Sequence, residues 1–179
     1  MNTFIVTPPT VEPVTLSEAK AQLRIEDAFT LDDDYISALI SAARDRCEHY
    51  CNQFLTAKDI RIAINGSISG AHKLPYEGLT ITDVKYIDSS NIEQTLDTAD
   101  YSYDSDNQTL KFFSTIAVPT FSVYATTSAP AELEGVKMAI KMIVADLYEL
   151  RTETAVGVSL ADNPAVKSLL YPYRLELGI

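Results

Sequence analysis

The order of periodic segments along the chain constrains its fold more than any single motif. Helical periodicity occupies the beginning and the end of the 179 residues, whereas residues 57–129 follow the twofold period of β-strands. We therefore predict an α+β protein, in which a bundle of about four helices carries an inserted small antiparallel β-sheet module. The predicted parts are an extended N-terminal arm (1–14), a helical domain (15–56 with 130–179) and the β-rich module (57–129).

Two long segments carry the strongest helical patterns. They run from Asp32 to about Phe54 and from Pro130 to about Arg151, and in both the apolar residues recur at every third or fourth position. The polar positions of the first segment, which include Arg44 and Glu48, are predicted to face water. Because an isolated helix cannot leave such a stripe exposed, we predict that the two long helices pack against each other.

Two shorter helices complete the helical domain. Thr15 and Glu18 have the spacing of a capping box, which predicts a helix from Thr15 to about Arg24. Asn163 followed by Pro164 is typical of a helix start, because asparagine caps the first turn and proline needs no amide hydrogen there. The last helix is therefore predicted to begin at this pair.

The central region alternates between apolar and polar residues in short segments. Turn-forming residues separate these segments, as in antiparallel sheets. The predicted strands are Asp59–Ile64, Leu79–Ile87, a hairpin of Tyr101–Tyr103 with Leu110–Phe113, and a last strand containing Phe121, Val123 and Ala125.

Charge and hydropathy narrow the class of protein. The formal net charge is −11, and both helical blocks and the β-rich region each carry more acids than bases. Because nucleic-acid binding depends on clustered lysine and arginine, we do not expect tight binding to DNA. The chain has no apolar run of about eighteen residues and no secretory leader pattern, which predicts a soluble protein made and used inside a cell.

Three groups of side chains have the composition of metal sites, but their context favours other roles. On a helix, His49 projects about 160–200° away from Cys47 and Cys51, so the three cannot share a metal. The acidic run 32–34 is typical of a first helical turn, where the helix dipole favours acids. The segment 104–108 precedes neither the glycine nor the glutamate of a calcium loop, and it indicates a hairpin turn instead.

The sequence predicts no catalytic residue, no metal ligand and no cofactor. It has no glycine-flanked serine nucleophile and no phosphate-binding glycine loop. Cys47 and Cys51 lie one helical turn apart, which predicts reduced core residues rather than a disulfide. Its 25 acidic residues leave open a carboxylate site that no motif marks.

Four stretches of the chain together resemble the gp6-like head-tail connector proteins of tailed phages and prophages. They are PVTLSEAKAQLRI (13–25), DDDYISALISAARDRCEHYC (32–51), PAELEGVKMAIKMIVADLYELR (130–151) and NPAVKSLLYPYR (163–174). The residues that carry the resemblance are Leu16, Ala19, Leu23, Arg24, Tyr148, Arg151, Leu169, Leu170, Pro172, Tyr173 and Arg174. The simplest members of that family are almost wholly helical, so the strand-rich insert is a departure from the family pattern.

The resemblance implies a structural role in the virion. Similar subunits form a ring of roughly twelve copies below the portal protein, extend the DNA channel and join the tail-side neck proteins. It implies assembly in the cytoplasm of the bacterial host, a final location in the head-tail neck, and no membrane contact. DNA would pass through the channel without specific binding, and no enzymatic activity is implied.

Two apolar segments and the final motif supply candidate interface residues. Residues 1–14 are too apolar for an ordinary solvated tail, and the stretch 152–162 is more apolar than a free connector needs. The candidates are Phe4, Ile5, Val6, Val156, Val158, Tyr173 and Arg174. Packing on the same subunit, or disorder, would explain both segments equally well.

Two other classes of protein remain open on the sequence. One is a prophage-encoded DNA-packaging factor or small enzyme, which requires a pocket with several perturbed carboxylates. The other is a tail-completion ring protein, which we would expect to rely mainly on its sheet rather than on helices.

Overall fold

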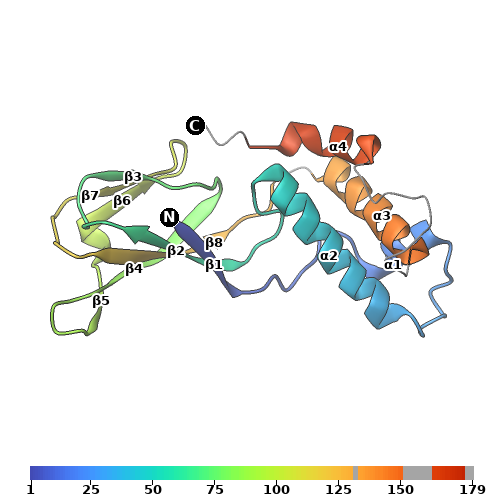
Figure 1. Cartoon of the computed structure of the whole chain (residues 1–179), viewed down its shortest axis with the longest axis horizontal. Coiled ribbons are helices and arrows are strands. Elements are labelled where there is room, and N and C mark those ends of the chain that lie inside the picture. The colour runs from blue at the N-terminus through green and yellow to red at the C-terminus, as the bar shows by residue number, and fades with distance from the viewer. Residues whose placement is uncertain (131–132, 151–162, 176–179) are drawn as a thin grey trace. The chain divides into compact units, whose positions relative to one another are not determined.

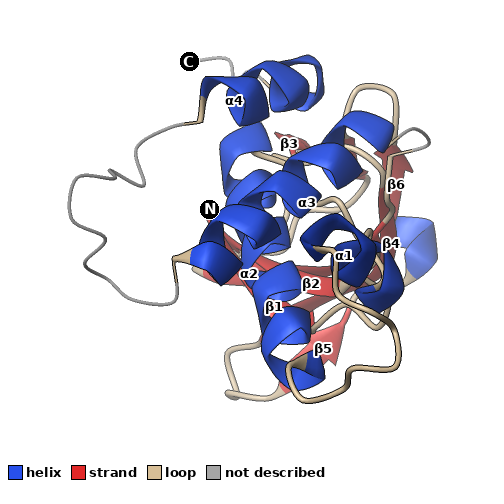
Figure 2. Ribbon diagram, turned by 90° about the vertical axis from the view of Figure 1, so that its right-hand side faces the viewer, coloured by secondary structure: helices blue, strands red, loops and turns tan. Residues whose placement is uncertain are grey.

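The chain folds into two compact units, one built of strands and one built of helices (Figures 1 and 2). The computed structural model describes residues 1–130, 133–150 and 163–175. The β unit comprises Met1–Val11 and Thr56–Ala129, and the helical unit comprises Glu12–Leu55 and Pro130–Ile179. This composition is the predicted α+β class.

The β unit contains two antiparallel sheets. The larger sheet has the order β1-β2-β8-β4-β5 and the smaller has the order β3-β7-β6. The strands of the larger sheet are β1 (Asn2–Thr7), β2 (Asp59–Asn65), β8 (Thr120–Thr127), β4 (Leu79–Ile87) and β5 (Glu93–Thr95). Those of the smaller sheet are β3 (Ala71–Lys73), β7 (Thr109–Phe112) and β6 (Tyr101–Asp104), and the 3₁₀ turn η1 (Thr98–Asp100) precedes β6.

The core of the β unit follows the alternation of its central strands. Ile60, Ile62 and Ile64 of β2 are buried and lie opposite the buried Ala125, Val123 and Phe121 of β8. The ring of His72 on β3 then lies edge-on to Phe121 and to Phe112 of β7, with centroid distances of 5.3 and 5.7 Å. These rings therefore join the two sheets.

The sequence predicted the long strands of this unit but not the short ones. β2, β4, β8 and the β6–β7 hairpin lie where we predicted strands. β3 and β5 are three residues each and are too short to show a period. The prediction of a separate N-terminal arm over residues 1–14 differs from the structure, because Asn2–Thr7 pairs with β2 as the first strand of the larger sheet.

The helical unit contains four α-helices among its described residues. They are α1 (Leu16–Leu23), α2 (Asp33–Cys51), α3 (Glu134–Glu149) and α4 (Pro164–Leu170), and the 3₁₀ turn η2 (Tyr171–Tyr173) follows α4. The predicted capping box of α1 is present, since the Thr15 amide donates to Glu18 Oε2 at 2.8 Å and the Glu18 amide donates to Thr15 Oγ1 at 3.2 Å. Asn163 caps α4 through its side chain.

The apolar faces of α2 and α3 share one core, as predicted. Its buried members are Ile36, Ile40, Ala43, Cys47 and Cys51 of α2 with Val136, Ala139, Ile140, Ile143 and Val144 of α3. Gly135 allows α3 to approach the C-terminal segment closely. A Cβ at this position would lie 2.9 Å from Tyr173 Cε2 and 3.2 Å from the Leu169 carbonyl oxygen, which leaves no room for a larger residue.

Two predicted helix boundaries are wrong. α2 ends at Cys51 rather than near Phe54, because Asn52 adopts a left-handed conformation with φ of 55°, a common way to terminate a helix. α3 begins at Glu134, so Pro130 is not its first residue. Its predicted end at Arg151 lies outside the described residues.

Candidate functional site

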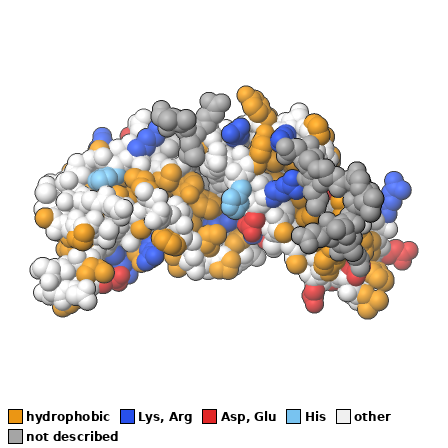
Figure 3. Space-filling model, viewed as in Figure 1, with side chains coloured by type: hydrophobic (Ala, Val, Ile, Leu, Met, Phe, Trp, Pro, Cys, Tyr) orange, Lys and Arg blue, Asp and Glu red, His pale blue; other side chains and the backbone are white. Residues whose placement is uncertain are grey.

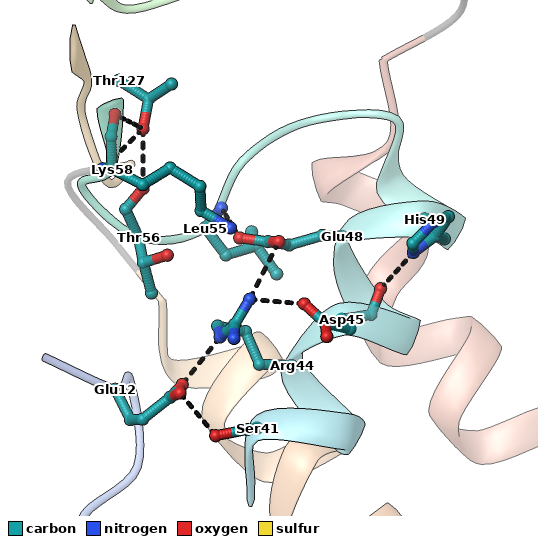
Figure 4. A network of polar contacts seen from close by, with 10 residues as sticks. All are labelled: Glu12, Ser41, Arg44, Asp45, Glu48, His49, Leu55, Thr56, Lys58 and Thr127. Atoms are coloured by element: carbon teal, nitrogen blue, oxygen red, sulfur yellow. Dashed lines mark hydrogen bonds and ion pairs between the residues drawn. The ribbon is translucent and has the colours of Figure 1, made fainter. Parts of the chain in front are cut away.

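A buried ion cluster lies on α2 (Figure 4). Arg44 Nε is 2.8 Å from Glu12 Oε2, and Arg44 Nη1 is 2.6 Å from Asp45 Oδ1 and 3.1 Å from Glu48 Oε2. Arg44 and Glu48 are only 5% and 8% exposed. The prediction that these polar positions face water is therefore wrong, because the chain on both sides of α2 folds back over them.

The cluster connects α2 to the two segments that enter and leave the helical unit. Glu12, the first residue of this unit, accepts hydrogen bonds from Arg44 and from Ser41 Oγ, the latter at 2.8 Å. Glu48 Oε1 accepts the amide hydrogen of Leu55, the last residue before the chain crosses into the β unit, at 2.9 Å. Arg44 and Glu48 thus bind the chain to α2 at Glu12 and at Leu55, which border two of the three crossings between the units.

Electrostatics keeps this arginine charged. Burial by itself lowers the pKa of Arg44, but the hydrogen bond and charge of Glu12, together with the charges of Glu48 and Asp45, outweigh burial and raise the pKa. Its Nε and Nη1 atoms contact three carboxylates of its own unit. These contacts are typical of a residue that stabilises the fold.

The acidic run at the start of α2 makes contacts within the protein, in agreement with a role at a helix start. Lys20 is almost fully buried, and its Nζ lies 2.5 Å from Asp33 Oδ1 and donates to the Asp27 carbonyl oxygen at 3.1 Å. The Tyr148 hydroxyl donates to Asp32 Oδ2 at 2.5 Å. These bonds attach α1 and α3 to the first turn of α2.

The β6–β7 turn shows how its acidic residues are used. Asp104 Oδ1 accepts the amide hydrogens of Asp106 and Asn107 at 3.1 and 3.2 Å. The side-chain hydrogen bond from Asn107 and these backbone donors lower the pKa of Asp104. The predicted hairpin turn is therefore confirmed, and its carboxylate stabilises the turn.

Both cysteines are free and buried in the helical core, as predicted. Burial raises the pKa of the Cys47 thiol to about 12 and that of the Cys51 thiol to about 11, from an ordinary value of 9.0. In the unfolded chain the thiols ionise near pH 9, whereas in the folded protein they stay protonated up to about pH 11–12. Ionisation therefore favours the unfolded chain as the pH rises from 9 toward 11–12, and it does not affect stability below pH 9. We expect the free energy of unfolding, measured in urea, to fall across this range.

Other groups also titrate at alkaline pH, so the measurement needs a matched variant. Replacing Cys47 and Cys51 with alanine should reduce the slope of stability against pH between pH 9 and 11. In the unaltered protein at pH 8, a thiol-specific reagent should react with neither cysteine until urea unfolds the helical unit. Rapid reaction of either thiol in the folded protein would contradict the burial described here.

The N-terminal candidate interface residues lie together on β1. Phe4, Ile5 and Val6 are 46%, 54% and 54% exposed, although each belongs to a strand of the larger sheet. The Arg61 guanidinium lies 4.7 Å from the centroid of the Phe4 ring, so one face of this ring is covered by a cation. The strand therefore presents apolar side chains at the surface of the β unit.

The C-terminal candidates lie in the helical unit. Tyr173 is half-buried against the helical core, and its carbonyl oxygen accepts a hydrogen bond from Gln53 Nε2. Arg174 is exposed, and its guanidinium lies 5.6 Å from the centroid of the Tyr50 ring. Tyr173 thus packs on its own subunit, and Arg174 lies over the Tyr50 ring of α2. Val156 and Val158 lie outside the described residues.

Sequence reasoning missed several exposed apolar side chains. These are Phe29, Leu31 and Tyr35 around the start of α2, Ile87 and Ile92 at the β4–β5 turn, Phe113 after β7, and Tyr171 in η2. Leu31 is 85% exposed. An apolar residue within a polar turn segment could have indicated such exposure, and this signal is clearest at Leu31 and Ile92.

The surface offers little sign of metal, membrane or nucleic-acid binding among the described residues. In that part of the chain no group of three histidine, cysteine or acidic side chains is suited to hold a metal ion. None of the described helices has the length and hydrophobicity to cross a membrane. On the face that Figure 3 shows, lysine and arginine side chains are scattered rather than gathered in one patch.

Comparisons with known proteins agree on one class. A family model described as phage gp6-like head-tail connector protein matches residues 13–117, which is more than half of the chain. The match includes α1, α2 and most of the β unit, whereas the resembling residues from Tyr148 onward lie outside it. No curated protein matches the sequence.

Solved structures share the whole fold. A chain from the neck of an empty gene transfer agent (GTA) particle computed with C6 symmetry has a TM-score of 0.77 at 19% identity, covering 100% of this chain and 98% of that one. A chain from the native GTA virion has a TM-score of 0.75 at 19% identity with the same coverage. A chain from a native GTA neck computed with C12 symmetry has a TM-score of 0.64 at 17% identity and covers 98% of both chains.

Proposed function

This chain belongs to the phage gp6-like head-tail connector family, and we propose that it works as a structural subunit of the head-tail neck of a phage-like particle. The observation that carries this proposal is the family match across α1, α2 and most of the β unit. The shared fold with chains from GTA necks supports it over the full length, so the β unit belongs to a fold that those neck particles also contain.

We propose that copies of the protein assemble as a ring below the portal, extend the DNA channel and join the tail-side neck proteins. The GTA necks computed with C6 and C12 symmetry support a cyclic arrangement. A cyclic ring uses two unlike surfaces on each copy and closes by rotation. Within each copy, the helices described here would act as a bundle, in which Arg44 and Glu48 bind the chain at Glu12 and Leu55.

The acidic character of the chain suits a channel that does not retain DNA. The formal net charge is −11, whereas tight binding of phosphates depends on clustered lysine and arginine. We propose that the channel wall is neutral or acidic and that the subunit has no catalytic activity. Assembly in the bacterial cytoplasm and final placement in the virion neck follow from the same proposal.

The proposal is tested by removing the protein from assembling particles. Deletion of its gene should leave DNA-filled heads and free tails that do not join, and expression in trans should restore joined particles visible by negative-stain electron microscopy. Purified protein added to portal-bearing heads should add a ring of density at the portal vertex. Joined particles in the deletion strain would refute the neck assignment.

A further inference from the structure

β1 forms an unprotected edge of the larger sheet. It pairs with β2 on one side, and no strand of the described chain pairs with its other side. Residues 1–11 contain no charged side chain, and charges are one of the features that usually block natural edge strands. An edge of this kind exposes unpaired backbone donors and acceptors and readily accepts another strand.

Only the first part of β1 is open in this way. The register with β2 shifts between Ile5 and Thr7, which leaves Val6 at a bulge, and Pro8 and Pro9 follow directly. Bulges and prolines both end strand pairing. The available edge is therefore the segment Asn2–Ile5.

One face of this open segment continues the core of the β unit. Ile5 lies opposite Ile60 and shares its face of the sheet, yet Ile60 is fully buried and Ile5 is more than half exposed. Phe4 lies on the other face, beside Arg61. A strand added along β1 would pair with the free backbone and cover Ile5 at the same time.

We propose that the Asn2–Ile5 edge is the surface through which one copy of this protein binds an extended segment of the next copy in the ring. This inference rests on the proposed function, because a cyclic neck brings many copies side by side. The contact joins unlike surfaces. Pairing of β1 with β1 of another copy would instead be twofold and would close a dimer, which is not the repeating contact of a ring.

The opposite edge of the same sheet is not the partner. Neighbouring strands twist by about 20–25°, so the steps from β1 to β5 accumulate about 80–100°. Copies in a C12 neck differ by a rotation of only about 30°. A continuous sheet from β5 of one copy into β1 of the next would turn too far to close, so β1 meets a surface of its neighbour other than β5.

Photo-crosslinking tests this contact directly. p-Benzoylphenylalanine in place of Phe4 keeps an aromatic ring at an exposed position, and irradiation of assembled necks should give a ladder of covalent multimers of this chain. Mass spectrometry should place the links outside residues 1–7 and outside 93–95. Links to β1 or β5 of another copy, links only to a different virion protein, or no links in assembled necks would overturn the inference.

A matched pair of substitutions gives an independent readout. Ile5→Lys places a charge on the open edge and should abolish rings at the portal vertex while leaving the circular dichroism spectrum and Tm of the free protein unchanged. Val11→Lys makes the same change at an exposed residue beyond the strand and should assemble normally. Normal rings from Ile5→Lys would refute the edge contact. If Ile5→Lys does not fold, the crosslinking experiment alone tests whether the Asn2–Ile5 edge forms the contact.

The two proposals fail in different ways. If the unaltered protein forms no ring on portal-bearing heads, the proposed neck function fails. If rings form but neither crosslinks nor the Ile5→Lys variant involves the Asn2–Ile5 edge, the function stands and only this contact is wrong.

Discussion

Replacing Arg44 with alanine should destabilise the helical unit by about 3–5 kcal/mol, because it removes the guanidinium that lies 3.1 Å from the buried Glu48 carboxylate. It also releases Glu12, and so loosens the segment that enters this unit. Urea unfolding followed by far-UV circular dichroism measures the loss, since the chain contains no tryptophan and the helices dominate that signal. Arg46→Ala is the matched control on the same helix, and at this exposed position the change should stay within about 0.5 kcal/mol.

A second variant separates the effect of the Glu48 charge from the effect of lost packing. Glu48→Gln removes the charge and keeps an oxygen that accepts the Leu55 amide hydrogen. The double variant Arg44→Ala with Glu48→Gln should therefore be more stable than Arg44→Ala alone. Equal stability of the two would show that the buried carboxylate is not the source of the loss.

Replacing Ile140 with alanine should cost about 2–5 kcal/mol, because its fully buried side chain lies in the core that α2 and α3 share. Deleting this side chain removes apolar contacts and leaves a cavity in a densely packed region. The same urea titration measures the change. We expect the unfolding of the helical unit to shift to lower urea concentration while its slope stays unchanged.

Met138→Ala provides the control within α3. Met138 is 43% exposed, so its truncation should cost far less than that of Ile140. Similar losses at both positions would show that burial in the shared core does not determine the cost of truncation. Loss of this packing would remove the rigid scaffold on which the proposed neck contacts rely.

The segments that the sequence predicted correctly carry their own signal, either a regular pattern or a capping motif. The helices α1 and α4 followed from local chemistry, since a capping box and an asparagine-proline pair act within one turn. The strand β2 followed from three isoleucines in alternation. Such signals do not depend on the rest of the chain, so these elements could be predicted from the sequence alone.

The errors arose where a distant segment determines the outcome. Asn2–Thr7 has no alternating pattern, and it becomes a strand because β2 offers an edge from residues far along the chain. Of the candidate interface residues, Phe4, Ile5 and Val6 thereby share one strand, whereas Tyr173 packs on its own unit. The spacing of residues along the sequence does not predict contacts between segments that lie far apart in the chain.

The sequence by itself determined the helices, the longer strands and the pairing of α2 with α3, because an apolar stripe must be buried wherever it occurs. Only the tertiary structure decided that Arg44 and Glu48 are buried and that β1 ends the larger sheet with an open edge. The physical reason is that burial of a charge and exposure of a strand edge depend on which other segments cover them. That covering is a property of the folded chain rather than of any local pattern.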